Sequence, residues 1–324
     1  TNDDLAKPLN TSDEWIYSHT GIHARHVAEE DDSASTMGTK AAKLALEAAN
    51  VKPEDIGLIV VATSTADYNP FPSTACLVQA QLGCTNAGAF DLQAACSGFV
   101  YALEQARGFL NFYPEKKALV IGSECLTRVV NWADRSSCIL FGDGAGALVL
   151  GNDEAPGAAA THTKAYTILG ADGTGANFIT RTGGTKDALQ FDPEFGIPMP
   201  PPPVQPEMKL AGHDVFAFAV RTLSKVVTDL CEKFGTTPEQ GVDRVFAHQA
   251  NGRIIEAVAR RMKLPLSKFW LNLASTANTS AASIPISLDQ AVRAGELKDG
   301  MKIVMVGFGA GLTYAGTYCT WPNL

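Results

Sequence analysis

The chain has 324 residues, of which 46% are hydrophobic and 19% charged, and its formal net charge is −8 at pH 7. This length suits a large core with two domain-sized units, and the composition is typical of a folded, enzyme-like protein rather than a disordered one. The negative charge argues against global binding to nucleic acid or to an anionic membrane, and no apolar run approaches the roughly 20 residues that cross a bilayer.

The seven cysteines are spread along the chain, mostly within apolar runs. An odd number of cysteines without a C-x-x-C pair is typical of reduced thiols in a cytoplasmic protein. No His/Cys pair has the spacing of zinc ligands, so we expect no metal site. The sequence does not begin with methionine, and we expect that a segment before Thr1 is missing.

Strand-like and helix-like runs alternate along the chain, which predicts an α/β fold with largely buried sheets. In the first half we expect helices at 33–50, 73–82 and after Cys96, and strands at 56–63, 88–92, 117–123 and 144–151. In the second half we expect helices at 213–234, 251–263 and 280–294, and strands at 243–249, 268–273, 302–308 and 309–319.

The order of these elements repeats at a nearly constant offset. Val120 and Val304 are 184 residues apart, and Ile59 and Val245 are 186 residues apart. Such a repeat predicts two similar halves related by a pseudo-twofold axis, with an active site between them. The expected division is a first half at 1–160, a loop-rich connection at 161–212 and a second half at 213–324.

The connection contains a proline run at 198–206, within the segment 191–212. Proline lacks the backbone N–H and favours extended polyproline geometry, so a semi-rigid surface connection is expected. A lid beside a substrate channel is the alternative.

Cys96 lies among small residues, where a strand-like run gives way to a helical one. A position at the N-terminus of that helix favours the thiolate and lowers the pKa of the thiol. Cys96 is therefore a candidate nucleophile, and a buried structural cysteine is the alternative.

Two further candidates come from the second half. His248 ends an apolar strand and precedes a helix, where side chains reach the crevice at a sheet edge. Asn278 lies among small residues before a helix, in the loop that the repeat pairs with the Cys96 corner, so the two should face one another. A satisfied structural histidine and a helix-capping asparagine are the alternatives.

Two glycine motifs, at 142–146 and 307–311, are each followed by a strand rather than a helix. This order disfavours a dinucleotide-binding fingerprint, which needs a strand, a turn and a helix. The motif at 307–311 is better suited to a tight turn that presents backbone N–H groups to a developing oxyanion.

Taken with their motifs, Cys96, His248 and Asn278 resemble the condensing enzymes of the thiolase superfamily, and most of all β-ketoacyl-acyl-carrier-protein synthase III. The shared motifs are TSDEWI (11–16), RSSCILFGDGAGA (135–147), HQANGRII (248–255), NTSAAS (278–283) and GFGAG (307–311). The resemblance covers essentially the whole chain and implies a thiolase-like fold, a layered α-β-α-β-α sandwich built from two similar halves.

Relatives within the superfamily differ at single positions. Degradative thiolases carry a second cysteine where Phe308 stands, and chain-elongating ketosynthases carry a second histidine where Asn278 stands. The residues present here therefore match the chain-initiating enzymes.

The resemblance also implies a mechanism without any cofactor. Cys96 takes the acyl group from an acyl-CoA, and malonyl-acyl-carrier protein then loses CO₂ and attacks the acyl-enzyme. Neutral His248, protonated on Nε2, and Asn278 donate hydrogen bonds to the malonyl thioester oxygen. The backbone N–H groups of Cys96 and Ala310 hold the oxyanion, although the family usually has glycine at the place of Ala310.

Further positions are implied only by the resemblance. The expected substrate-binding residues are Trp15 and Arg135 around the CoA adenine, Arg253 near its phosphates, Asn251 and Gly212 along the pantetheine arm, Phe71 and Phe141 near the acyl pocket, and Phe308. Phe71 would reach across the interface of a homodimer. His19 departs from the family pattern, which often has arginine there, and this puts a nucleotide contact in doubt.

The helix at 252–263 has a local basic face formed by Arg253, Arg260, Arg261 and Lys263. Carrier proteins are acidic, so this face is a candidate dock for them, and an ordinary solvated helix face is the alternative. Family members normally begin with a strand before the position of Thr1, so the first half is expected to lack an inner strand.

Three functions follow from these observations. The first is the decarboxylating condensation of a short acyl-CoA primer that initiates fatty acid synthesis. The second is the same reaction in a secondary-metabolite pathway with an aromatic, branched or longer primer, and the loop at about 172–208 leaves the primer open. The third is a non-catalytic scaffold, against which the intact Cys–His–Asn set argues.

Overall fold

The computed structural model describes residues 1–152, 165–181, 190–191, 194, 198–199 and 208–322. Its first sheet consists, in spatial order, of β2 (Gly88–Leu92), β1 (Ile56–Ala62), β3 (Lys117–Cys125) and β4 (Asp143–Leu150). β1 pairs in parallel with β2 and β3, whereas β4 runs antiparallel to β3. Every residue of β1 is buried, as expected for a parallel strand covered on both faces.

The second sheet repeats this plan. It consists, in spatial order, of β10 (Arg244–Ala247), β11 (Lys302–Gly309), β12 (Thr313–Thr320) and β5 (Ala165–Ala171). β10 and β11 are parallel, and β11 and β12 are antiparallel, so the triplet β10-β11-β12 matches β1-β3-β4. β5 then adds an antiparallel edge strand to β12.

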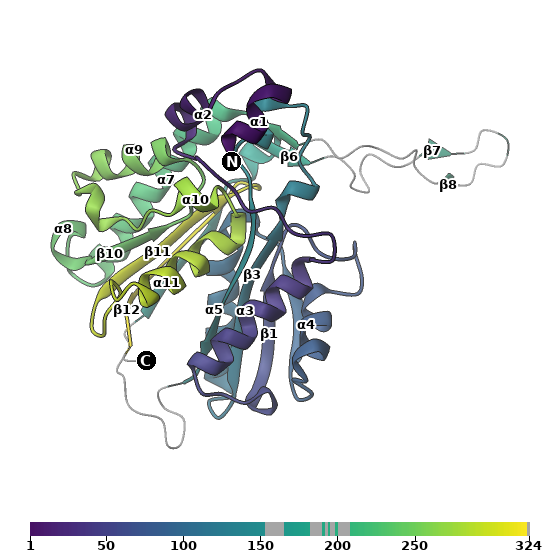
Figure 1. The fold of residues 1–324 in the computed structure, drawn as a ribbon. Helices are drawn as coiled ribbons and strands as arrows, with labels where there is room; N and C mark the ends of the chain where they lie inside the picture. Colours follow the sequence, from purple (N-terminus) through teal and green to yellow (C-terminus); the bar gives the residue numbers. More distant parts are fainter. Residues whose placement is uncertain (153–164, 182–189, 192–193, 195–197, 200–207, 323–324) are drawn as a thin grey trace.

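Helices form three layers around the two sheets (Figure 1). The outer face of the first sheet is covered by α3 (Ala34–Ala48) and α4 (Thr74–Leu82), and that of the second by α7 (Gly212–Lys233) and α9 (Gly252–Met262). The middle layer is formed by α5 (Gly98–Phe112) and α11 (Ser283–Arg293). The result is the predicted α-β-α-β-α sandwich.

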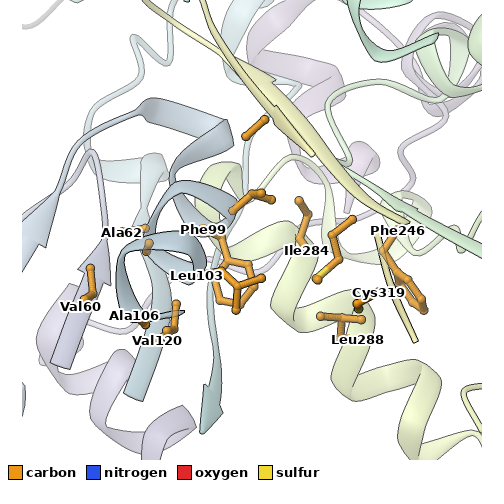
Figure 2. Close-up of a cluster of buried hydrophobic side chains, with 14 of the residues drawn as sticks. Val60, Ala62, Phe99, Leu103, Ala106, Val120, Phe246, Ile284, Leu288 and Cys319 are labelled. Carbon is orange, nitrogen blue, oxygen red and sulfur yellow. The ribbon is translucent and has the colours of Figure 1, made fainter. Parts of the chain in front are cut away.

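The middle layer is the core that joins the two halves. Figure 2 shows Phe99 and Leu103 of α5 close to Ile284 and Leu288 of α11, with strand residues such as Val60 and Phe246 around them. Full burial of one such side chain contributes about 1.5–3 kcal/mol, so this cluster fixes how the halves meet.

Glycine allows the backbones of the halves to approach closely. A Cβ at Gly146 in β4 would lie 2.8 Å from the backbone nitrogen of Ile286 in α11. A Cβ at Gly122 in β3 would lie 2.4 Å from the carbonyl oxygen of Ala281. The glycine motif at 142–146 thus serves strand–helix packing.

Smaller elements complete the described chain. They are α1 (Asn2–Leu9), α2 (Asp13–Thr20), α6 (Arg135–Cys138), α8 (Pro238–Gly241), α10 (Leu273–Thr276), β6 (Ile179–Arg181), β9 (Met208–Leu210), β7 (Gln190–Phe191) and β8 (Pro198–Met199). β6 pairs with β9, and β7 pairs with β8. In the described part of the chain, no helix combines the length and the apolar character needed to cross a membrane.

Most predicted elements are confirmed within two or three residues, but the strand expected at 268–273 is wrong. Only Phe269 forms a bridge, to Val245 of β10, before the chain turns into α10 at Leu273. The 3-10 turn Leu266–Lys268 directly precedes that bridge and leaves no length for a ladder. The glycine motif at 307–311 is also only partly a turn, because Gly307–Gly309 end β11.

The expectation that the first half lacks an inner strand is wrong as well. Its four strands are continuously hydrogen-bonded, so no gap is left between them. In the second sheet the first strand of the repeat, β5, lies at the edge beside β12, and the equivalent position in the first sheet is the edge beside β4. β5 was not predicted, and it joins the second sheet although it falls in the expected connection 161–212. The three-part division of the chain stays a prediction, and most of the proline run lies outside the described residues.

Candidate active site

Cys96 occupies a tight corner between β2 and α5. The corner is a 3-10 turn, η2 (Ala95–Ser97), entered through Ala95 at a φ of 45°. The hydroxyl of Ser97 donates to the carbonyl oxygen of Ala94 over 2.8 Å and fixes the bend. Cys96 is half-buried there, two residues before the first residue of α5, as the sequence predicts.

His248 directly follows β10 and is buried. Its backbone N–H donates to the carbonyl oxygen of Val306 over 2.8 Å, which extends the pairing with β11 by one residue. Its Nδ1 lies 2.7 Å from Oγ of Ser283, and its ring forms a T-shaped contact with that of Phe308 at 5.7 Å between ring centroids. These contacts leave Nε2 as the ring nitrogen available to the cavity.

Asn278 lies in the loop between α10 and α11 and is tied to the first half. Its N–H donates to the carbonyl oxygen of Leu140 over 2.9 Å, and its own carbonyl oxygen accepts from Gly142 over 3.0 Å. Its side-chain Oδ1 accepts from the N–H of Ser280 over 2.8 Å. Because a backbone N–H can only donate, the oxygen of the carboxamide is held there and Nδ2 remains as a donor.

One cavity of about 650 Å³ joins these three residues across the two halves. Of the predicted site residues, it is lined by Cys96, His248, Asn278, Ala310, Phe141, Gly212, Asn251 and Phe308. The structure thus brings the sulfur, the imidazole and the carboxamide to the same space.

The pKa of Cys96 does not follow the expectation from the helix N-terminus. Loss of water around the sulfur raises the pKa of this thiol to about 12; a hydrogen bond from Ser280 lowers it in part, and the nearby Glu124 carboxyl raises it further. Desolvation outweighs the helix terminus, so Cys96 rests as a thiol at neutral pH.

Burial acts on His248 in the opposite direction, because it disfavours the charged imidazolium. It lowers the pKa of the imidazole to about 3. The ring is therefore neutral at physiological pH, and one of its nitrogens carries a proton while the other carries a lone pair.

The loop after β11 lies directly against the Cys96 corner. A Cβ at Gly309 would lie 2.6 Å from the backbone nitrogen of Cys96, so this position must be glycine for the two segments to meet. Ala310 follows at the cavity wall. Its N–H and that of Cys96 come from these adjoining segments.

Trp15 and Arg135, the residues expected around adenine, contact each other. The guanidinium carbon of Arg135 lies 4.7 Å from the ring centroid of Trp15, and His19 stacks on Trp15 at 4.2 Å between ring centroids. Arg135 also donates to the carbonyl oxygen of Asn10 over 2.9 Å. An adenine between Trp15 and Arg135 would have to part them, because in this structure they touch.

Asn251 and Arg253 link α9 to the end of α2. Nδ2 of Asn251 donates to the carbonyl oxygen of His19 over 3.2 Å, and Nε of Arg253 donates to that of Ser18 over 2.9 Å. Asn251 lines the cavity, whereas Arg253 is exposed outside its lining.

The remaining predicted positions lie away from the cavity of this chain. Phe71 is 79% exposed and is not part of the lining. Arg260, Arg261 and Lys263 are exposed at the end of α9, which leaves their basic face open to solvent.

Sequence reasoning missed polar residues behind and beside the three candidates. Ser280 and Ser283 belong to the NTSAAS motif, but only its asparagine was singled out. Glu124 at the end of β3 is fully buried, its pKa is raised by burial, and its Oε2 accepts from the hydroxyl of Thr65 over 2.7 Å. Gln93 lines the cavity and a second hollow of about 560 Å³ beside it.

Comparison with known families identifies two matching regions. Residues 90–167 match the family described as 3-Oxoacyl-[acyl-carrier-protein (ACP)] synthase III, and residues 231–321 match the C-terminal part of the same family. The β-ketoacyl-[acyl-carrier-protein] synthase III of Caldanaerobacter subterraneus subsp. tengcongensis is 45% identical over 328 residues, which cover 100% of this chain and 94% of that protein. The enzyme of the same name from Clostridium acetobutylicum is 41% identical over 324 residues, with 100% and 94% covered.

Solved structures agree with these matches. The β-ketoacyl-[acyl-carrier-protein] synthase III of Thermus thermophilus superposes with a TM-score of 0.87 at 38% identity and covers 100% of this chain and 95% of its own. The priming β-ketosynthase of the R1128 polyketide biosynthetic pathway reaches the same TM-score of 0.87 at 34% identity, with 100% and 92% covered.

Proposed function

This chain belongs to the 3-oxoacyl-[acyl-carrier-protein] synthase III family and has its thiolase-like fold; from this premise we propose that it condenses an acyl-CoA primer with malonyl-acyl-carrier protein. The products are 3-oxoacyl-acyl-carrier protein, CoA and CO₂, and the reaction initiates fatty acid synthesis. The observation that carries the proposal is the convergence of Cys96, His248 and Asn278 on one cavity.

In the first half-reaction, the sulfur of Cys96 attacks the carbonyl carbon of the acyl-CoA thioester. A bond forms between that carbon and the Cys96 sulfur, the bond to the CoA sulfur breaks, and the thiol proton leaves with CoA. The backbone N–H groups of Cys96 and Ala310 would stabilise the negative oxygen of the tetrahedral intermediate. Because Cys96 rests as a thiol, its proton must leave the sulfur as the bond to the acyl carbon forms, and stabilisation of the oxyanion by these donors favours that step.

In the second half-reaction, the malonyl thioester oxygen accepts hydrogen bonds from Nε2 of His248 and Nδ2 of Asn278. Loss of CO₂ leaves an enolate whose charge these donors stabilise. The enolate carbon then attacks the acyl carbonyl on Cys96, and collapse of that adduct expels the Cys96 thiolate, which takes up a proton from solvent and restores the thiol. The imidazole donates in its neutral form, because burial lowers the pKa of His248 to about 3.

The remaining assignments complete this proposal. Trp15, Arg135 and Arg253 would contact the nucleotide of CoA, Gly212 and Asn251 its pantetheine arm, and Phe141 and Phe308 the acyl group. The basic face of Arg253, Arg260, Arg261 and Lys263 would hold the acidic carrier protein. A cytoplasmic homodimer, with Phe71 of each chain reaching the other, belongs to the same proposal, as does a reaction that uses neither a metal nor a bound cofactor.

A test of the covalent step uses radiolabelled acetyl-CoA with the wild-type protein and two variants. We expect label that survives denaturation on the wild type and on Cys125→Ala, a control at another buried cysteine of the same half. Cys96→Ala should carry none. Equal labelling of Cys96→Ala and the wild type would contradict the proposal.

The secondary-metabolite alternative is not favoured, because relatives at 41–45% identity are named for the initiating enzyme, whereas the polyketide priming enzyme is 34% identical. A panel of acyl-CoA primers with malonyl-carrier protein separates the two. Turnover is expected with short straight-chain primers, and turnover restricted to aromatic, branched or longer primers would favour the alternative.

A further inference from the structure

Ser283, the first residue of α11, lies between His248 and Ser280. Its Oγ is 2.7 Å from Nδ1 of His248 and 2.8 Å from the carbonyl oxygen of Ser280. Ser283 is 2% exposed and His248 is 1% exposed, so water does not compete for these contacts. Among the described residues, Ser283 is the hydrogen-bonding partner of Nδ1.

The proton of the Ser283 hydroxyl can point toward either of two acceptors, and each orientation fixes a different tautomer of the His248 imidazole. If it points to the carbonyl oxygen of Ser280, Nδ1 must carry the ring proton, and Nε2 presents a lone pair to the cavity. If it points to Nδ1, the ring proton lies on Nε2, which becomes a donor to the cavity.

The carbonyl oxygen of Ser280 does not depend on that hydroxyl. The backbone N–H of Ser283 already donates to it, in the cap of the 3-10 turn Ser280–Ala282. Nδ1 of His248 has no such second partner in the described chain. The hydroxyl can therefore turn toward Nδ1 without leaving the carbonyl of Ser280 unpaired, so this orientation carries no penalty of about 1–3 kcal/mol for a buried unpaired group.

We propose that Ser283 donates its hydroxyl proton to Nδ1 of His248 and thereby keeps the ring proton on Nε2. Ser283 is then a positioning residue for the condensation half-reaction, in which Nε2 must donate to the malonyl thioester oxygen. This inference rests on the proposed function for its catalytic consequence. Burial removes the imidazolium as an alternative donor, so the choice of tautomer decides whether His248 can act.

The same helix supplies a matched control. Ser287 is also fully buried, and its hydroxyl donates to the carbonyl oxygen of Ser283 over 2.8 Å without contacting His248. Ser287→Ala removes a buried hydroxyl one turn further along α11. It therefore measures how much the loss of a buried hydroxyl affects the rate when no contact with His248 is lost.

The test compares the wild type with Ser283→Ala, Ser283→Thr and Ser287→Ala. Acylation of Cys96 is measured with labelled acetyl-CoA, and condensation of the preformed acyl-enzyme is measured with malonyl-carrier protein. The ¹⁵N shifts of the imidazole nitrogens, assigned with His248→Gln, report the tautomer directly. We expect the wild type to carry its proton on Nε2.

Ser283→Ala should slow condensation about 10–100-fold and shift the imidazole toward the Nδ1–H form, with acylation within about twofold of the wild type. This loss of rate is smaller than the 10²–10³-fold loss typical when a whole donor is removed, because a fraction of the molecules keeps the imidazole proton on Nε2. Ser283→Thr, which keeps the hydroxyl, and Ser287→Ala should condense within about threefold of the wild type.

A wild-type spectrum with the proton on Nδ1 would overturn the inference, as would equal losses in both half-reactions of Ser283→Ala. If Ser283→Ala does not fold, the wild-type spectrum and Ser283→Thr still decide. If wild-type Cys96 takes no label, the proposed function fails, but the spectra of the wild type and Ser283→Ala still test the link between Ser283 and the tautomer.

Discussion

The two halves of the molecule contain the same backbone turn but carry different functional side chains on it. In each half a three-residue 3-10 turn leads into a helix of the middle layer, and each turn begins at positive φ: 45° at Ala95 and 48° at Ser280. These two residues are 185 positions apart, within the range of the sequence repeat. The shared backbone therefore belongs to the fold, and only the side chains differ.

The alignment at offset 185 also refines the expectation that Cys96 and Asn278 are counterparts. Their loops correspond, but Ala281 stands at the place of Cys96 and Gln93 at the place of Asn278. The nucleophile thus lies within one turn, and the carboxamide lies two residues before the other. The site is asymmetric because Cys96 and Asn278 occupy positions of the repeat that differ by three residues.

The strongest test of this comparison moves the thiol from Cys96 to the equivalent position in the turn of the second half. The double variant Cys96→Ala, Ala281→Cys keeps a cysteine at a matching backbone position. We expect condensation to fall about 10⁴-fold or more, because position 281 is buried outside the cavity lining, to which Cys96 and Ala310 belong. Measured turnover, with the single variant Ala281→Cys as control, decides; recovery of activity in the double variant would show that the corners are interchangeable.

The pKa of Cys96 gives the next largest effect. Because it is raised to about 12, the thiolate fraction rises tenfold per pH unit at neutral and mildly alkaline pH, and alkylation by iodoacetamide should rise likewise without a plateau up to pH 10. At pH 7 the rate should be about 10³ below that of free cysteine, whose pKa is about 8.5. Mass spectrometry in a Cys76→Ala background, which removes the exposed thiol, measures it.

A plateau below pH 8 in that experiment would contradict burial as the dominant influence. It would show that the terminus of α5 lowers the pKa of the thiol after all, as the position of Cys96 in the sequence suggests.

The two carboxamides provide a third comparison. Asn278→Ala removes the Nδ2 donor and should slow condensation about 10²–10³-fold, while acylation of Cys96 stays within about twofold. Gln93→Ala, at the equivalent position of the first half, should change condensation less than about threefold, because Gln93 is exposed. Single-turnover assays of each half-reaction test both. A larger loss in Gln93→Ala would assign the donor role to the other half.

The sequence predicts more of the fold than of the site. Alternating periodicity and the 185-residue repeat place most strands and helices, because buried parallel strands and amphipathic helices carry strong local patterns. The edge strand β5 and the bridge at Phe269 depend on a neighbouring strand, and no local pattern distinguishes them. The candidate residues were found as a set, through the motifs that surround them.

What the sequence could not give is the balance of forces within the cavity. The position of Cys96 before a helix suggests a lowered pKa, but desolvation depends on residues that arrive from the other half. The link between His248 and Ser283 joins residues 35 positions apart, and only the packing of α11 against β10 reveals it.

The smallest expected effect concerns the glycines on which the two corners rest. Gly122 of β3 lies against Ala281, and Gly307 of β11, again 185 positions later, lies against Cys96. An added Cβ would be 2.4 Å from the carbonyl oxygen of Ala281 in the first case and 3.3 Å from that of Cys96 in the second. Contact with backbone cannot be relieved by a side-chain rotation, so the shorter distance must move a main chain.

We therefore expect Gly122→Ala to lower the free energy of unfolding by about 2–3 kcal/mol and Gly307→Ala by about 1 kcal/mol. The order should reverse for catalysis, because Gly307→Ala displaces the carbonyl of the nucleophile, whereas Gly122→Ala displaces the turn after Asn278. Urea unfolding measures the first quantity and the rate of Cys96 acylation the second. Equal losses of stability and of acylation rate in both variants would mean that the two turns are displaced together rather than independently.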